Sequence, residues 1–177
     1  MNRYSLKDGE IEITNQFPDG HMDEFLRGAN DSEMGFRLMA HSFPYPYTEE
    51  DALAFINKNR ESGNELFEID FYIMYMNRLA GVIGLSDIDY ENSRAHIGYW
   101  VAVDYRNKGV GRKALGLAIQ FSREKLKLNS LYTTVLTLNI PSIIILTDNG
   151  FTMDGISRYR FRYENKFYSA FIFSLLL

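Results

Sequence analysis

In several segments of this sequence apolar residues alternate with polar ones, and in other segments they recur at helical spacing. Alternation is typical of strands with one buried face, and a spacing of about three to four residues is typical of helices. The alternation predicts strands at residues 10–14, 66–76, 79–86, 94–103, 131–138, 152–163 and 167–176. The helical spacing predicts helices at 19–29, after Thr48, at 109–128 and from Pro141 onward. This order of elements predicts an α/β fold with a mixed central sheet of about seven strands and helices on both faces.

Residues that favour caps and turns stand at the ends of several of these elements. Thr48 precedes a run of acidic residues, which suits an N-cap followed by carboxylates at the positive end of a helix dipole. Pro141 fits the first turn of a helix, and Gly150 fits its end, where a left-handed residue is common. We expect Asn77-Arg78 and Glu164-Asn165 to form tight turns between neighbouring strands.

The composition is that of a folded globular protein. Of the 177 residues, 46% are apolar and 24% are charged. We expect one domain over residues 1–177, because no linker, repeat or low-complexity stretch interrupts the predicted elements. The lack of cysteine excludes disulfides and thiolate chemistry, and the three histidines show no metal-ligand spacing. We therefore expect no metal.

Charge and hydropathy narrow the possible partners. The formal net charge of -4 makes a nucleic-acid partner unlikely, because affinity for a phosphate backbone comes mainly from clustered Lys and Arg. The apolar runs are too short for a leader peptide or a membrane span, so we expect no membrane partner and a cytoplasmic location. The sequence leaves both a monomer and a homodimer open.

The most informative segment runs from a strand end through a glycine-containing loop into a long helix. Residues 101–113 read VAVDYRNKGVGRK. The first N–H groups of a helix are unpaired and lie at the positive end of its dipole, and Gly109 and Gly111 let an anion approach the backbone. This arrangement suits phosphate binding, although glycine pairs and solvated basic clusters also occur without a ligand.

Two other phosphate-binding patterns fit this segment less well. Residues 109–114 satisfy the dinucleotide pattern G-x-G-x-x-A, but the preceding strands read as antiparallel and no ribose-binding acid ends the next strand. The P-loop pattern fails because the sequence has no Gly-Lys-Ser/Thr.

The same segment resembles the signature of the GNAT acetyltransferases. Residues 106–111 match R/Q-x-x-G-x-G/A, and residues 97–101, IGYWV, are similar to the IGYWL of the branch that includes ribosomal-protein N-terminal acetyltransferases. Residues 44–52, PYPYTEEDA, resemble that branch's P-x-P-Y-T-x-E-D-A, and Asn139 with Ser142 matches its N-x-x-S. The matches extend from about residue 45 to the end of the chain.

The resemblance implies a single GNAT domain that uses acetyl-CoA as co-substrate to acetylate a primary amine. The cofactor's pyrophosphate would lie on the loop at 106–112, and its pantetheine would lie along the preceding strand. The implied cofactor-binding residues are Val101, Val103, Arg106, Asn107, Lys108, Gly109, Val110, Gly111, Arg112 and Asn139. For Asn139, a capping role at the start of the next helix is the alternative.

Direct attack of a neutral amine on the thioester needs an oxyanion donor and two proton transfers. By resemblance, the donor is the N–H of Val101. Ser142 is the candidate for protonating the thiolate, and a simple helix-start serine is the alternative. His96 stands where the branch has a strand glutamate and is the candidate for taking the proton of the amine. Alternatively, His96 only packs, and a carboxylate such as Glu68 or Asp70 takes this proton.

Some positions depart from the pattern of the branch. Thr147 and Asn149 stand where the branch has Glu and Lys, and no tyrosine follows Asn139 where many GNAT enzymes keep a general acid. The expected activity is N-acetylation, with a protein N-terminal α-amine as the first acceptor and a polyamine or another small amine as the second. A degenerate GNAT domain that binds coenzyme A without turnover is the alternative from another class.

Overall fold

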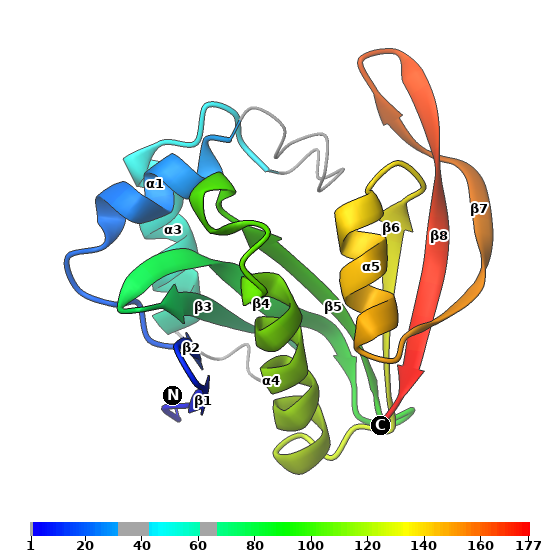
Figure 1. Cartoon of the computed structure of the whole chain (residues 1–177), viewed down its shortest axis with the longest axis horizontal. Coiled ribbons are helices and arrows are strands. Elements are labelled where there is room, and N and C mark those ends of the chain that lie inside the picture. The colour runs from blue at the N-terminus through cyan, green and yellow to red at the C-terminus, as the bar shows by residue number, and fades with distance from the viewer. Residues whose placement is uncertain (1, 32–42, 61–66) are drawn as a thin grey trace.

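The computed structural model describes residues 2–31, 43–60 and 67–177, and in these residues a single eight-stranded sheet carries helices on both faces (Figure 1). The strand order is β1-β2-β3-β4-β5-β6-β8-β7, and all neighbours are antiparallel except β5 and β6, which are parallel. The strands are β1 Ser5–Asp8, β2 Ile11–Thr14, β3 Ile69–Tyr75, β4 Arg78–Asp89, β5 Arg94–Val101, β6 Ser130–Leu136, β7 Thr152–Tyr163 and β8 Lys166–Leu176. The helices are α1 Met22–Ala29, α3 Glu49–Arg60, α4 Val110–Glu124 and α5 Ile140–Asp148, with a short 3₁₀ turn η1 at Val103–Tyr105.

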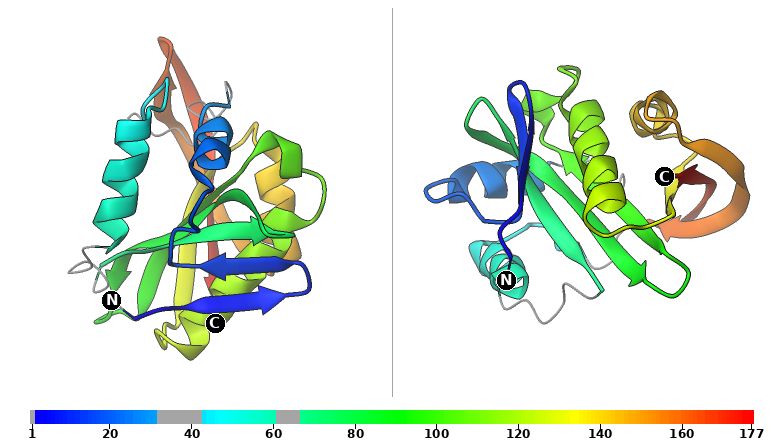
Figure 2. Two further views of the ribbon diagram at one scale, coloured as in Figure 1. Left: turned by 90° about the vertical axis from the view of Figure 1, so that its left-hand side faces the viewer. Right: turned by 90° about the horizontal axis from the view of Figure 1, so that it is seen from below.

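Two hydrophobic cores hold the helices against opposite faces of the sheet (Figure 2). On one face α4 buries Ala114 and Phe121, and the Phe121 ring lies 4.9 Å from the ring of Phe71 in β3. On the other face α1 and α3 cover a second core, in which Phe25 lies 5.8 Å from Trp100 of β5. Trp100 is therefore a packing residue. Because side chains alternate along a strand, β3, β4 and β5 contribute residues to both cores.

The structure confirms the caps predicted for α3 and α5. Thr48 Oγ1 accepts a hydrogen bond from the N–H of Asp51 at 3.2 Å, and the N–H of Thr48 donates to the Asp51 carboxylate at 2.8 Å. Gly150 has φ +85° after the end of α5, and the N–H of Phe151 donates to the carbonyl of Leu146 at 3.1 Å. The turn at Glu164-Asn165, where both residues have positive φ, is also as predicted.

Several strand predictions need correction. The sheet has an additional strand, β1, whose residues are mostly exposed, so its sequence carries little alternation of apolar and polar positions. The turn between β3 and β4 is formed by Met76 and Asn77, both with positive φ, and Arg78 already belongs to β4. The strand predicted over 94–103 ends at Val101. Residue 66, the predicted start of the second strand, lies outside the described residues.

Candidate functional site

Strands β5 and β6 separate after a short stretch of parallel pairing. In the described residues their register ends at His96 and Tyr132. Beyond this point β5 stays paired with β4 up to Val101, and β6 stays paired with β8 up to Leu136. The facing edges of β5 and β6 therefore part toward their carboxyl ends, and we call this opening the splay.

The hydrogen-bond pattern of β5 shows which of its backbone groups face the splay. The N–H of Ala102 donates to the carbonyl of Ala80 at 2.8 Å, which makes these two residues a bonded pair across β4 and β5. Opposite residues in an antiparallel ladder alternate between bonded and non-bonded pairs. The N–H groups of Val101 and Tyr99 consequently point away from β4 and into the splay. An extended ligand can bind these groups as an added strand would.

The N-terminus of α4 presents further N–H groups beside the end of β5. Gly109 is the N-cap residue and has φ +76°, a left-handed conformation that favours glycine. The first helical hydrogen bond runs from Lys113 N to Gly109 O at 3.1 Å, so the N–H groups of Val110, Gly111 and Arg112 have no acceptor within the helix. Among the residues that the structure describes, a Cβ at Gly109 would meet nothing within 4 Å. This open set of donors at a helix N-terminus suits a phosphate group.

Arg106 braces the end of β5. Its Nε donates to the carbonyl of Val101 at 3.0 Å, and its Nη2 pairs with the carboxylate of Asp31, beyond the end of α1. The guanidinium of Arg106 already has two partners, so a ligand that binds Arg106 would have to bind it together with the carbonyl of Val101 and the carboxylate of Asp31.

Lys108 and Arg112 carry their charges close to the N-terminus of α4. Lys108 Nζ lies 5.7 Å from the centroid of the Tyr105 ring, and Arg112 forms an exposed ion pair with Asp148 of α5 at 3.5 Å. Exposed ion pairs contribute little to stability. Both cations can therefore turn toward a bound phosphate at little cost.

Val103 and Asn107 lie in the loop between β5 and α4. Val103 is 60% exposed and belongs to η1 rather than to the strand predicted to hold it. Asn107 has φ +59°, a conformation that asparagine tolerates better than most residues. A cofactor contact for either residue stays a prediction.

Gly111 has a packing role that the sequence does not show. A Cβ at Gly111 would lie 3.1 Å from Cδ1 of Ile145 in α5 and 3.4 Å from Cγ2 of Val101. The absent side chain therefore lets α4 approach both β5 and α5.

Gly111→Val should destabilise the fold by about 1–3 kcal/mol, because the added atoms overpack this contact. Gly116→Ala is the control, because a Cβ there would lie 3.5 Å from Oδ1 of Asn149, an ordinary contact, and alanine favours the helix interior by about 0.5–1 kcal/mol. Urea unfolding measures both changes. A Gly111→Val protein as stable as the wild type would contradict the packing role.

Ser142 and Tyr99 form a hydroxyl pair beside the splay. The Tyr99 hydroxyl of β5 lies 2.9 Å from Ser142 Oγ in the first turn of α5. Burial raises the pKa of Tyr99 to about 12, although the hydrogen bond with Ser142 opposes the rise, so the phenol stays protonated at neutral pH. Asn139 caps α5 by accepting a hydrogen bond from the N–H of Ser142 at 3.4 Å. The capping role of Asn139 is therefore confirmed, and its contact with a cofactor stays a prediction.

His96 lies on the other face of β5. Its Nδ1 is 3.1 Å from Ser86 Oγ, and its ring centroid is 5.6 Å from that of Tyr132. Burial lowers the pKa of His96, Asp87 raises it and Arg160 lowers it further, with a net decrease. The imidazole is therefore mainly neutral at pH 7, and its second ring nitrogen can serve a ligand. A catalytic role for His96 stays a prediction.

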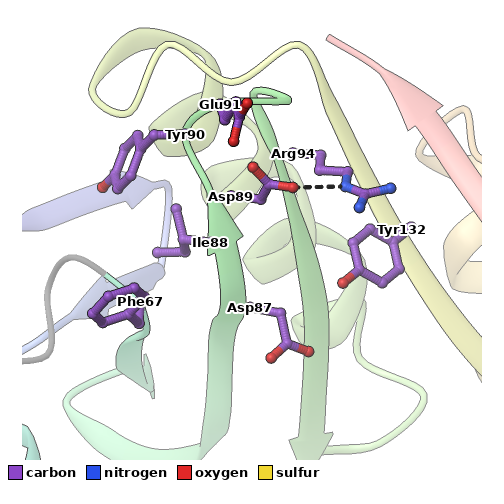
Figure 3. A pocket seen from close by; sticks show the side chains of 8 residues that line it. All are labelled: Phe67, Asp87, Ile88, Asp89, Tyr90, Glu91, Arg94 and Tyr132. Atoms are coloured by element: carbon purple, nitrogen blue, oxygen red, sulfur yellow. Dashed lines mark hydrogen bonds and ion pairs between the residues drawn. The ribbon is translucent and has the colours of Figure 1, made fainter.

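A pocket of about 560 Å³ lies around the turn between β4 and β5, at the opposite end of β5 from Gly109 (Figure 3). Figure 3 shows Arg94 turned toward Asp89, with Nε 3.2 Å from the carboxylate. The pocket is lined by Phe67, Asp87, Ile88, Asp89, Tyr90, Glu91, Arg94 and Tyr132. It adjoins His96 through Tyr132 and is separate from the N-terminus of α4.

In the part of the chain that the structure describes, no group of three or more His, Asp or Glu side chains could hold a metal ion. None of the helices in these described residues is both long enough and apolar enough to cross a membrane.

Known proteins resemble the chain in sequence and in fold. The sequence profile described as Acetyltransferase (GNAT) domain matches residues 15–152. A putative ribosomal N-acetyltransferase of Bacillus subtilis (strain 168), YdaF, is 31% identical over 94 residues, which cover 53% of this chain and 51% of YdaF. The chain spans about half the length of this relative and of an uncharacterized N-acetyltransferase of Bacillus licheniformis, 51% and 54%.

Solved structures share the fold over almost the whole chain. RimL, a ribosomal L7/L12 alpha-N-protein acetyltransferase in complex with coenzyme A, is 14% identical with a TM-score of 0.86, covering 98% of both chains. Spermidine N-acetyltransferase from Vibrio cholerae, in complex with CoA and spermine, is 18% identical with a TM-score of 0.80, covering 94% of this chain and 95% of the other.

Proposed function

Because the chain belongs to the GNAT acetyltransferase family, we propose that it transfers the acetyl group of acetyl-CoA to a primary amine by direct attack in a ternary complex. The observation that carries the proposal is the splay between β5 and β6, with the N-terminus of α4 beside it. The inward N–H groups of Tyr99 and Val101 suit the carbonyl oxygens of an acetylated pantetheine arm, one of which is the thioester oxygen, and the helix N-terminus suits the pyrophosphate of the cofactor. Residues 1–177 would act as one such domain, without a metal.

The residues around the splay suit the charges that develop during acyl transfer. As the amine attacks, negative charge develops on the thioester oxygen, and the N–H of Val101 is the proposed donor to it. When the C–S bond breaks, the thiolate needs a proton, which Ser142 can deliver with the protonated phenol of Tyr99 behind it. His96 is the candidate from the sequence for taking the proton of the amine.

Ser142→Ala should lower kcat about tenfold or more with little change in acetyl-CoA affinity, because it removes a proton donor but no cofactor contact. Tyr99→Phe removes the hydroxyl that is hydrogen-bonded to Ser142 and should lower kcat less than Ser142→Ala does. Steady-state kinetics with calorimetry separates the two quantities. An unchanged kcat in Ser142→Ala would contradict the role of Ser142 as proton donor and would make it a simple helix-start serine.

A protein N-terminal α-amine is the proposed acceptor, and a polyamine is the second candidate. The resemblance to YdaF, a putative ribosomal N-acetyltransferase, and to RimL supports the first, and the resemblance to the spermidine N-acetyltransferase from Vibrio cholerae supports the second. Free thiol release should be compared for peptides with a free N-terminus, the same peptides with a blocked N-terminus, and spermidine. Turnover that disappears when the peptide is blocked supports the first acceptor, and turnover with spermidine alone supports the second.

A further inference from the structure

Three residues form a row across the sheet on the face that α1 and α3 cover. Asp70 of β3 pairs with Gly84 of β4, and Gly84 pairs with Gly98 of β5. A Cβ built on Gly84 would collide with Oδ1 of Asp70, so the carboxylate leans over β4 toward β5. Among the described residues, a Cβ on Gly98 would meet only Cε1 of His96, at 3.7 Å, so none of these residues fills the space above Gly98. We call Asp70, Gly84 and Gly98 the glycine row.

The glycine row leads to the part of β5 that borders the splay. Gly98 directly precedes Tyr99, whose N–H points into the splay. Neighbouring strands lie about 4.8 Å apart, so one water or one amine nitrogen can bridge from a carboxylate above Gly84 to a group bound at β5. Within the described residues, no side chain or backbone group donates a hydrogen bond to the Asp70 carboxylate. None of these residues therefore competes with a ligand for a hydrogen bond to this carboxylate.

The two faces of β5 present different proton-transfer groups. Tyr99 and Val101 belong to the α4 face, where the Tyr99 hydroxyl meets Ser142. Asp70 and Gly98 belong to the opposite face, together with His96. A nucleophile that approaches from the Asp70 side would therefore attack from the face opposite the donor for the leaving thiolate.

The charged groups around Asp70 come from its own strand and from α3. Burial raises the pKa of Asp70 to about 6, the nearby Glu68 carboxylate raises it and the Lys58 ammonium of α3 lowers it. Glu68 Oε1 lies 2.5 Å from Lys58 Nζ, although not at a hydrogen-bonding angle. Tyr47, which precedes α3, is also close enough for the charge of Asp70 to raise the pKa of its hydroxyl. At pH 7 to 8 Asp70 is thus mainly ionised and can attract an ammonium group.

We propose that Asp70 is the residue that binds the acceptor amine and takes its proton, with Gly84 and Gly98 keeping the path to β5 clear. The inference rests on the proposed acetyl transfer. A bound ammonium group first loses one proton to solvent, and the neutral amine nitrogen then forms the new C–N bond. A second proton passes from this nitrogen to the Asp70 carboxylate as the tetrahedral adduct forms and collapses. The C–S bond breaks, and the thiolate takes a proton from the Ser142 side. Asp70 then returns its proton to solvent.

Asp70→Asn should lower kcat/KM more than tenfold and remove the acidic limb of its pH profile, because the amide cannot accept the proton. Affinity for acetyl-CoA should stay unchanged, since the glycine row lies on the face opposite Ser142. Gly84→Ala is the second variant, because its methyl group displaces the carboxylate while Asp70 remains. It should lower kcat/KM in the same way.

Neighbouring variants test whether the limb belongs to Asp70 or to His96. Glu68→Gln should move the limb to lower pH, because it removes the anion that raises the pKa of Asp70, and Lys58→Met should move it to higher pH. Asp87→Asn is the matched control, because Asp87 raises the pKa of His96. It should leave the limb in place, and His96→Ala should retain the limb.

The outcomes separate this inference from the proposed function. An active wild type whose limb survives in Asp70→Asn and disappears in His96→Ala would overturn the role of Asp70 and assign the proton to His96. A limb that survives in both variants would overturn it as well. A wild type that binds acetyl-CoA but acetylates no amine would instead contradict the proposed function, before any variant is compared.

Discussion

Gly109→Asp is expected to reduce acetyl-CoA affinity by at least about two orders of magnitude. None of the described residues fills the Cβ position at Gly109, so the new carboxylate would stand among the N–H groups of Val110, Gly111 and Arg112, which have no acceptor within the helix. At about 5 Å from a phosphate charge and an effective dielectric constant of about 20, the repulsion is about 3 kcal/mol, which corresponds to a factor of more than one hundred in Kd. Isothermal titration calorimetry measures the loss directly.

Gly109→Asn is the control for this variant. Asparagine has almost the same shape as aspartate and tolerates the same left-handed conformation, so both variants carry the same backbone strain. The Gly109→Asn protein lacks the added charge and should bind acetyl-CoA clearly better than the Gly109→Asp protein does. Equal affinity in the two variants, in proteins that unfold at the same temperature, would place the pyrophosphate elsewhere.

Val101→Pro is expected to lower kcat/KM by about two to three orders of magnitude. Proline has no N–H, and the N–H of Val101 points into the splay rather than into the ladder with β4, so the sheet loses no hydrogen bond. Removing a single oxyanion donor typically costs about this much. The carbonyl of Val101 that accepts from Arg106 is retained.

Val101→Ala is the matched variant, because it loses the packing of the side chain against Gly111 but keeps the N–H. Steady-state kinetics and thermal unfolding should be measured on both. If the proline variant were as active as the alanine variant, the N–H of Val101 would contact neither the thioester oxygen nor the cofactor.

The sequence predicted the elements whose faces differ in polarity. Helix α4 buries residues at helical spacing, and the caps at Thr48 and Gly150 use side chains and conformations that are local in sequence. Strand β1 was missed because it lies at the edge of the sheet and is mostly exposed, so neither face leaves an apolar pattern. The end of β5 was placed too late because the apolar Val103 continues the alternation into η1.

The candidate site was predicted in part. The loop at 106–112 could be recognised because its residues are contiguous, and the structure places Gly109 at the N-cap of α4 as an anion site requires. The hydroxyl pair of Tyr99 and Ser142 joins residues far apart in sequence, so only tertiary structure reveals it. A signal did exist, since alternation puts Tyr99 on the face of Val101. The sequence could not show that Gly111 packs against α5.

The row formed by Asp70, Gly84 and Gly98 depends on the register of three strands. Register is set by turns and bulges as well as by alternation, and the turn after β3 lies one residue earlier than predicted. The sequence could therefore name Asp70 as a candidate carboxylate but could not show that two glycines open a path from it to β5.

The most direct test of the proposed function is a measurement of both products in one reaction. Purified protein is mixed with acetyl-CoA and an excess of amine, and free thiol and acetylated amine are quantified over time, the amine by mass spectrometry. The proposed function predicts that the two products appear at equal rates and that Val101→Pro slows both together. Binding of acetyl-CoA without either product, across α-amino peptides and polyamines alike, would contradict it and leave a domain that binds coenzyme A without turnover.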